Sequence, residues 1–164
     1  MSQDFAGYVQ SSKTILVPHD WDDSNRSMVW TSALEVDGIT VEGLQIRLSA
    51  QRELPDEAVM AQLEYRPPKG KPHQRAEWRP LSGHNNKGRG PPQHRYIEFR
   101  QTHIHRFDDN WLRSETRMLL GNLPIAIPIQ DLDSYDKFLD FCAKEFNVAN
   151  MAIVPVPPWR LTML

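Results

Sequence analysis

The chain has 164 residues, of which 40% are hydrophobic and 24% are charged, and its formal net charge is −2. This length predicts one domain over residues 1–164 with a core that needs no disulfide, and the composition excludes wholesale disorder. No apolar run approaches the roughly 20 residues that span a bilayer, so we expect no membrane partner and no secretory signal peptide. The single cysteine, Cys142, excludes an internal disulfide and a cysteine-rich zinc site, which indicates a cytoplasmic location.

The first half of the chain predicts an antiparallel meander. A short helix is expected over residues 2–13 and a short apolar strand at 15–17. Apolar and polar residues then alternate with a period of two, as in half-buried strands, and Asp37-Gly38 is a strong signal for a two-residue hairpin turn. The alternating segments are 27–36, a second strand that begins at Ile39, and 59–65.

The middle of the chain is rich in residues that interrupt regular structure. Residues 66–92 hold six of the 13 prolines and four of the eight glycines. We therefore expect a loop-rich basic insert over about residues 66–95. Further strands are expected at 76–81, 95–107 and 123–129. Pro124 and Pro128 place the last of these at a sheet edge or a bulge.

The clearest helix lies late in the chain. Asp133 or Ser134 is a suitable N-cap, Asn147 is a suitable left-handed C-cap, and the apolar residues between them recur at helical spacing. These residues are Tyr135, Phe138, Leu139, Cys142 and Phe146. Together the elements predict an α+β fold, in which an antiparallel sheet of about five to seven strands packs on this one main C-terminal helix. A last strand is expected at 153–156.

Positive charge is concentrated between Arg66 and Arg106. This stretch contains ten Lys or Arg, two acids and five of the six histidines. Its balance of +8 leaves −10 for the rest of the chain, given the net charge of −2. Such a block is either a solvated basic loop or a surface for phosphates, which guanidinium groups bind well. The candidate phosphate-binding residues are Lys87, Arg89, Arg95, Arg100 and Arg106.

Three histidines form the candidate centre of this block. On a strand, His103 and His105 point to the same side about 7 Å apart, and the loop that carries His84 leads toward that strand. This arrangement fits a metal site with three histidine ligands. It equally fits two imidazoles acting as acid and base on a phosphodiester. The alternative without chemistry is that the histidines end a sheet face and pair with Asp108 or Asp109.

The order of these motifs resembles a small bacterial and phage family of unknown function. Its members have a His-Thr-Asn-like turn, a His-x-His strand, an Ala-x-Pro strand and a closing amphipathic helix, matched here by His84-Asn85-Asn86, His103-Ile104-His105, 123–129 and a helix ending in 141–148. The likeness covers roughly residues 78–148, with longer links before and after the His-x-His strand. The chain is more loosely similar to toxins of bacterial toxin–antitoxin pairs. The resemblance implies a bacterial or mobile-element setting and no established activity.

The leading hypothesis is a small nucleic-acid-binding or nucleic-acid-processing protein, associated with defence or toxin–antitoxin biology. Its candidate activity is ribonuclease-like phosphodiester chemistry, with His84, His103 and His105 as catalytic residues. One alternative is a metal-binding domain in which the same three histidines hold a divalent ion; no other cofactor is expected. Another is a non-catalytic module whose basic loop docks an acidic protein partner. The sequence leaves the oligomeric state open.

Overall fold

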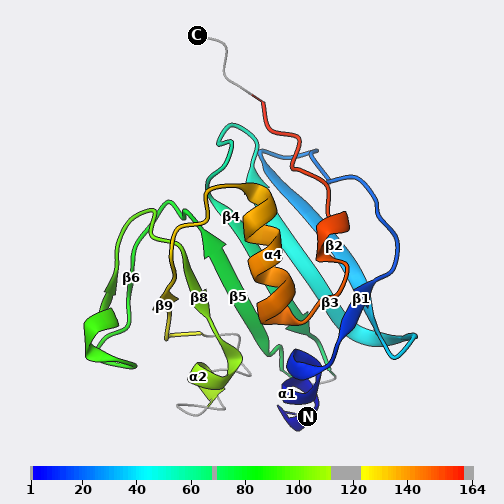
Figure 1. The fold of residues 1–164 in the computed structure, drawn as a ribbon, viewed down its shortest axis with the longest axis horizontal. Helices are drawn as coiled ribbons and strands as arrows, with labels where there is room; N and C mark the ends of the chain where they lie inside the picture. The colour runs from blue at the N-terminus through cyan, green and yellow to red at the C-terminus, as the bar shows by residue number, and fades with distance from the viewer. Residues whose placement is uncertain (1, 68–69, 112–122, 161–164) are drawn as a thin grey trace.

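The computed structural model describes residues 2–67, 70–111 and 123–160 of the chain. Its centre is a sheet of seven strands whose pairings are all antiparallel (Figure 1). In spatial order the strands are β1 (Lys13–Ile15), β2 (Ser27–Val36), β3 (Ile39–Gln51), β4 (Val59–Tyr65), β5 (His73–Trp78), β8 (His103–His105) and β9 (Ile127–Pro128). Between β5 and β8 the chain leaves this sheet and forms a separate hairpin of β6 (His84–Asn85) and β7 (Tyr96–Ile97).

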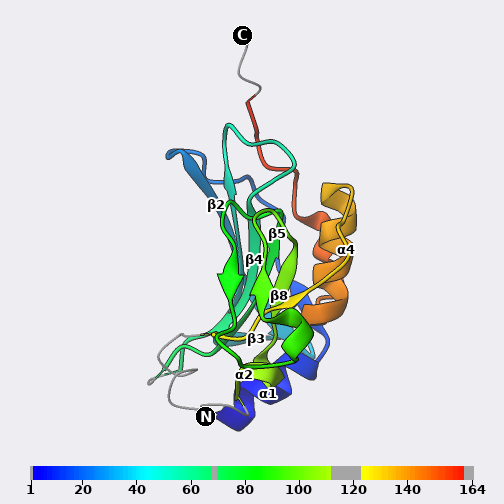
Figure 2. The same cartoon turned by 90° about the vertical axis from the view of Figure 1, so that its left-hand side faces the viewer.

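The main helix, α4 (Tyr135–Phe146), covers one face of the sheet (Figure 2). It begins after Ser134, whose side chain accepts a hydrogen bond from the amide of Lys137, and it ends at Asn147, which has a left-handed φ of 52°. The apolar side chains named above as its buried stripe are all buried. The α+β class, the antiparallel sheet and the helix packed on it are therefore as predicted. Burial also raises the pKa of the Cys142 thiol, as expected of a core residue.

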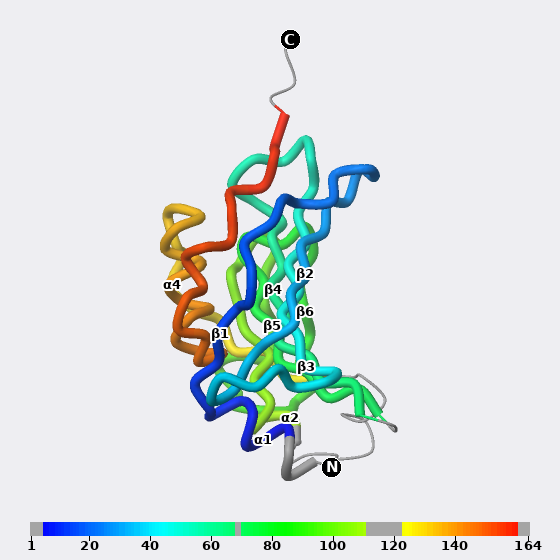
Figure 3. The backbone as a smooth tube through the Cα atoms, turned by 90° about the vertical axis from the view of Figure 1, so that its right-hand side faces the viewer, coloured from blue at the N-terminus to red at the C-terminus, as the bar shows by residue number. Residues whose placement is uncertain are grey.

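The other helices of the described residues are short. They are α1 (Ser2–Gln10), α2 (Phe107–Trp111), and the 3-10 helices at Pro92–His94 and Met151–Ile153. α1 and α2 lie side by side at one end of the sheet (Figure 3). The rings of Phe5 and Phe107 pack edge to face between them, with 5.0 Å between the ring centroids. Within the described ranges, no helix is long and apolar enough to cross a membrane.

The two faces of the sheet differ in chemistry because side chains alternate along each strand. One row of paired residues runs across five strands, and its side chains face α4. All of them are apolar and buried: Trp30, Leu48, Ala61, Ala76 and Ile104. The rows on either side point the other way and are mostly polar. They are Thr31, Arg47, Gln62, Arg75 and His105, and then Val29, Ser49, Met60, Glu77 and His103. The sheet thus has a core face and a polar face.

β5 corrects the bounds of the strand expected at 76–81, within the loop-rich insert predicted over residues 66–95. The strand lies within that segment and pairs with both β4 and β8. Its residues on the polar face are His73, Arg75 and Glu77, and even its core face begins with the buried Gln74. An alternation of charged residues with so few apolar partners carries little strand signal, which is why the first three residues of β5 lie outside the predicted strand.

Three other expected strands are shorter than predicted or absent. The segment 95–107 is divided into β7 and β8 by a turn in which Arg100 has a φ of 64°. In the segment 123–129 only β9 pairs, because two prolines remove backbone donors from it. A 3-10 turn, and not a strand, occupies Met151–Ile153.

Lys13 is a fully buried lysine at the junction between α1 and β1. Its Nζ donates to the carbonyl of Tyr8, to that of Val9 at 3.2 Å and to that of Ser11 at 2.6 Å. The carbonyls of Tyr8 and Val9 belong to the C-terminal end of α1, where a positive charge is favourable, and Ser11 directly follows the helix. Burial nevertheless lowers the pKa of Lys13 to about 8.

We expect the free energy of unfolding to rise between about pH 8 and pH 10.5, by up to about 3 kcal/mol. In this interval the unfolded lysine retains a proton that the folded lysine has released, so raising the pH penalises the unfolded state. Urea unfolding across this range, with Lys13→Met as the control, measures the effect. A difference between wild type and variant that is independent of pH would contradict it.

Candidate metal-binding site

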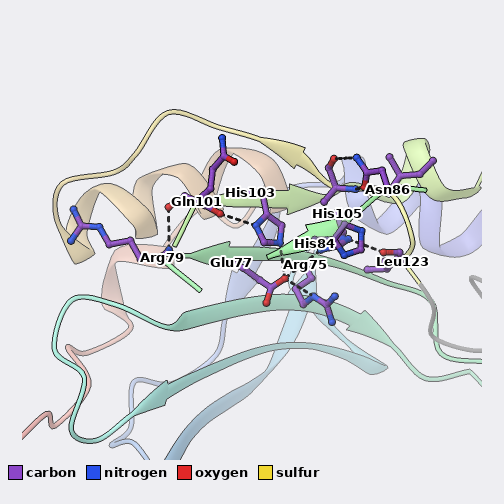
Figure 4. Close-up of polar contacts among 12 residues, drawn as sticks. Arg75, Glu77, Arg79, His84, Asn86, Gln101, His103, His105 and Leu123 are labelled. Carbon is purple, nitrogen blue, oxygen red and sulfur yellow. Dashed lines mark hydrogen bonds and ion pairs between the residues drawn. The ribbon is translucent and has the colours of Figure 1, made fainter. Parts of the chain in front are cut away.

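The pairing of β5 with β8 brings a carboxylate and two imidazoles together on the polar face. Glu77 lies directly opposite His103, and Arg75 lies directly opposite His105 (Figure 4). The ligand atoms of Glu77, His103 and His105 are all within 4.8 Å of one another. These residue types are the nitrogen and oxygen ligands of zinc and similar ions. The three side chains lie close enough to hold a metal ion.

Backbone carbonyls determine which nitrogen of each imidazole is protonated. His103 Nδ1 lies 2.9 Å from the carbonyl oxygen of Gln101, and His105 Nδ1 lies 2.8 Å from that of Leu123. A carbonyl oxygen can only accept, so each Nδ1 must carry the hydrogen. In a neutral ring the lone pair is then on Nε2. In both rings Nε2 is the nitrogen that faces Glu77.

The contacts with Glu77 leave one buried imidazole nitrogen without a hydrogen-bond partner. Its Oε2 lies 2.8 Å from Nε2 of His103 and 3.3 Å from Nε2 of His105. His105 Nε2 is buried and has no hydrogen-bond partner among the described residues. A proton on Nε2 of His103 would satisfy the shorter contact but not His105. A cation between the three groups would satisfy all of them.

The protonation states favour the same conclusion. Burial lowers the pKa of His105 to about 4, so this ring is neutral at pH 7. Burial would raise the pKa of Glu77, but contacts with His103 and His105 and the charge of Arg75 outweigh it and hold that pKa well below its usual range. Glu77 is therefore an ionised carboxylate beside a neutral His105 ring, as metal ligands require. Its 2.8 Å contact with Nε2 of His103 needs a hydrogen on that nitrogen, which a bound ion would displace.

His84 lies beside this cluster without completing it. Its ring centroid is 5.0 Å from that of His105 and 6.3 Å from that of His103, so the three histidines do come together as their spacing predicts. However, His84 Nε2 lies 2.7 Å from the carbonyl of Pro124 and must donate to it. The group of three ligands that the structure forms contains Glu77 in place of His84.

Glu77 is the site residue that the sequence interpretation missed. It was counted only as one of two acids in a basic block. The available signal was its position two residues after Arg75 in a segment of alternating polarity, which puts both side chains on one face once the segment is recognised as a strand. Its contact with the histidines could not be inferred without the β5–β8 register.

Two buried asparagines hold the backbone that carries the partner carbonyls. The amide of Asn86 donates to the carbonyls of His94 and Ala126, at 2.6 and 2.8 Å, and accepts from the Ala126 amide at 2.9 Å. Asn110 forms a similar two-way pair with Ile125, at 3.1 and 2.8 Å. The segment 123–126 also supplies the carbonyls that receive hydrogen bonds from His105 and His84. The asparagines therefore position the imidazoles indirectly.

The candidate phosphate-binding residues are not gathered at the histidines. Arg106 forms a bidentate ion pair with Glu145 of α4, at 3.1 and 2.8 Å, on the core side of the sheet. Arg100 pairs with Glu57 at 2.8 Å. The other three belong to the segment around β6 and β7, and form no ion pair within the described part of the chain. They are Lys87, Arg89 and Arg95, of which Arg95 lies over the ring of Tyr96.

The cluster meets solvent through Glu77. The side chains of His103 and His105 are 2% and 1% exposed, whereas that of Glu77 is 27% exposed. Glu77 also lines an open pocket of about 320 Å³ on the polar face.

Comparison of this chain with protein-family models, with curated proteins and with solved structures finds no match. The chemistry of the site is therefore argued from its geometry.

Replacing Asn86 with Ala should cost about 2–4 kcal/mol of stability, because buried backbone groups of Ala126 and His94 lose their partners. The neighbouring Asn85→Ala is the matched control. Asn85 is exposed and accepts only from the Lys87 amide, so its loss should cost less than about 1 kcal/mol. Chemical unfolding of both variants measures the difference, and equal losses would argue against the clamp.

Proposed function

We propose that this protein holds one divalent transition-metal ion of the zinc class, and that the ion serves hydrolysis of a ligand bound on the polar face. The ligands are Nε2 of His103, Nε2 of His105 and the carboxylate of Glu77. The observation that carries the proposal is the convergence of these three acceptor groups, with both Nδ1 hydrogens already taken by backbone carbonyls.

The ligand set indicates the kind of ion. Imidazole nitrogen with one carboxylate suits zinc and neighbouring first-row metals, whereas calcium and magnesium prefer oxygen ligands alone. Metal-binding histidines usually donate their second ring N–H to a carbonyl or carboxylate, which orients the ring and makes it a better ligand. His103 and His105 both have this second contact.

The number of ligands favours a catalytic over a structural role. Structural zinc sites are usually closed by four protein ligands, while catalytic sites use three and leave a position for water. Here three ligands converge within the described residues, and Glu77 borders an open pocket. An ion in such a site supplies Lewis acidity and lowers the pKa of a bound water toward neutrality.

The burial of the imidazoles bears on the alternative without metal. A general acid or base must come within hydrogen-bond reach of the proton that it transfers. His103 and His105 are almost completely buried, and each has one ring nitrogen occupied by the backbone. This arrangement supports their use as ligands more than their direct action on a phosphodiester.

Metal binding tests the proposal directly. The purified full chain should bind close to one equivalent of Zn²⁺ or Co²⁺ in titration calorimetry, and the Co²⁺ form should show the intense visible bands of a four-coordinate site. Glu77→Gln and His105→Asn should each weaken metal binding at least tenfold. Even the loss of a group that only orients a metal ligand typically weakens metal binding by about 10- to 100-fold.

His94→Asn is the matched control, because His94 is a histidine of the same basic stretch that lies outside the three-ligand cluster. Its affinity should equal that of the wild type. The proposal fails if the wild type binds no ion, or if the ligand variants bind as tightly as the control.

Metal should also stabilise the fold, because the ligands come from β5 and β8 and are assembled only in the folded chain. At a free Zn²⁺ concentration of about 100 times Kd the gain is about 2.7 kcal/mol, which corresponds to a rise in Tm of roughly 5–10 °C. Thermal unfolding with Zn²⁺ and with excess chelator measures this shift. Glu77→Gln should show a much smaller one.

A further inference from the structure

The polar face of the sheet carries two adjacent pockets that share Arg75. The first, of about 320 Å³, lies over β3, β4 and β5 and contains Glu77 and Arg75. The second, of about 250 Å³, lies over β4 and β5 and is lined by Gln62, Glu64, Arg66, Lys71, His73 and Arg75. Because Arg75 lines both, the two pockets are neighbours, and the first of them borders the candidate metal ligand Glu77. We call the two pockets together the Arg75 groove.

The acids of this groove are already committed to other groups. The carboxylate of Glu64 is 4% exposed and accepts hydrogen bonds from Gln45, Gln62 and Arg47, the last at 3.1 Å. Glu77 faces the imidazoles. Glu64 also lies 3.9 Å from Arg66, and Glu77 lies 3.6 Å from Arg75, so each acid offsets part of the positive charge of the groove.

The cations of the groove are accessible to a ligand. Arg66 has a side chain that is 61% exposed and lies 3.9 Å from Glu64, and Lys71 is exposed and forms no ion pair with the described residues. Arg75 Nε is buried and lacks a hydrogen-bond acceptor in the described ranges, although it lies 3.6 Å from Glu77. Three cations (Arg66, Lys71 and Arg75) outnumber two acids (Glu64 and Glu77) in the groove, and a divalent ion bound to Glu77 would make its net charge more positive.

From these contacts, and on the basis of the metal function proposed above, we infer that the substrate is a phosphodiester of a single-stranded nucleic acid. Arg75 would hold the phosphoryl group beside the ion, since guanidinium matches phosphate oxygens, and Arg66 and Lys71 would hold a neighbouring phosphate. Cations spread over two pockets favour a ligand with several phosphates over a single small anion. The two pockets are open and lie on a sheet face, which can take an extended single strand.

The reaction would be hydrolysis. The oxygen of one water forms a bond to phosphorus, and the ester bond from phosphorus to the leaving oxygen breaks. One proton of the water goes to the leaving oxygen and gives an alcohol, while the new phosphate monoester keeps the other. No oxidant, reductant or further co-reactant is needed.

Fluorescence anisotropy of the Zn²⁺-loaded full chain with a labelled 12-nucleotide single strand, as RNA and as DNA, tests the inference. We expect binding at 50 mM salt that weakens steeply at 200 mM. The double variant Arg66→Gln with Lys71→Gln should weaken binding about tenfold. It should also reduce the slope of log affinity against log salt by about 1.4, as expected for two lost contacts to a single strand.

The matched control is Lys87→Gln with Arg89→Gln, which removes two cations from the segment between β6 and β7 and should leave affinity unchanged. Zinc content of every variant is measured in parallel. A chain that binds zinc but no oligonucleotide would overturn this inference and leave the metal function standing. A chain that binds oligonucleotide through Arg66 and Lys71 without zinc would overturn the metal function alone.

Three further results would overturn the inference. The first is an affinity for polyglutamate of similar charge equal to that for the oligonucleotide, which would indicate a general preference for acidic polymers. The second is an affinity for a mononucleotide equal to that for the oligonucleotide. The third is loss of oligonucleotide binding in the Lys87 and Arg89 control but not in the groove variant. Cleavage of the bound strand that is abolished by Glu77→Gln, with binding retained, would support the hydrolytic step.

Discussion

The pairing of β5 with β8 is the constraint on which the rest of the site depends. Its register sets Glu77 opposite His103 and Arg75 opposite His105, while the residues between them, Ala76 and Ile104, face the core. Because side chains alternate strictly along a strand, a shift of one residue in β5 would send the carboxylate into the apolar layer, and the same shift in β8 would send both imidazoles there. Core packing against α4 therefore fixes the polar site on the opposite face, although α4 does not contribute to it.

Backbone carbonyls complete what the strand pairing begins. The hydrogen bonds from Nδ1 of His103 and His105 leave both Nε2 atoms facing one carboxylate oxygen. The segment that accepts from His105 has little regular structure of its own and is held by the amides of Asn86 and Asn110. These amides act as substitutes for strand pairing where prolines prevent it. In the His84-Asn85-Asn86 motif, Asn86 therefore supports the backbone of the segment that contains Ala126.

Folding also redistributes the positive charge that is so evident in the sequence. Arg79 pairs with Asp131, Arg100 with Glu57 and Arg106 with Glu145, so much of the basic block is balanced by acids from distant segments. The cations that remain beside the candidate metal ligands are those on β5 and at the end of β4. A single run of basic residues is therefore divided into paired structural contacts, an exposed group around the β6–β7 hairpin, and the Arg75 groove.

The sequence by itself determined the elements whose signals are local. The Asp37-Gly38 turn, the alternation in β2 and β4, and the capped amphipathic helix α4 were predictable, because turn geometry, strand period and helix period act over a few residues. His103 and His105 were likewise predictable as neighbours on one face. Only the tertiary structure decided that Glu77 joins them, that His84 donates to Pro124, and that Arg106 faces α4. These contacts join residues 26 to 40 positions apart, and such pairings follow from sheet register and chain packing, which leave no pattern in any short window of sequence.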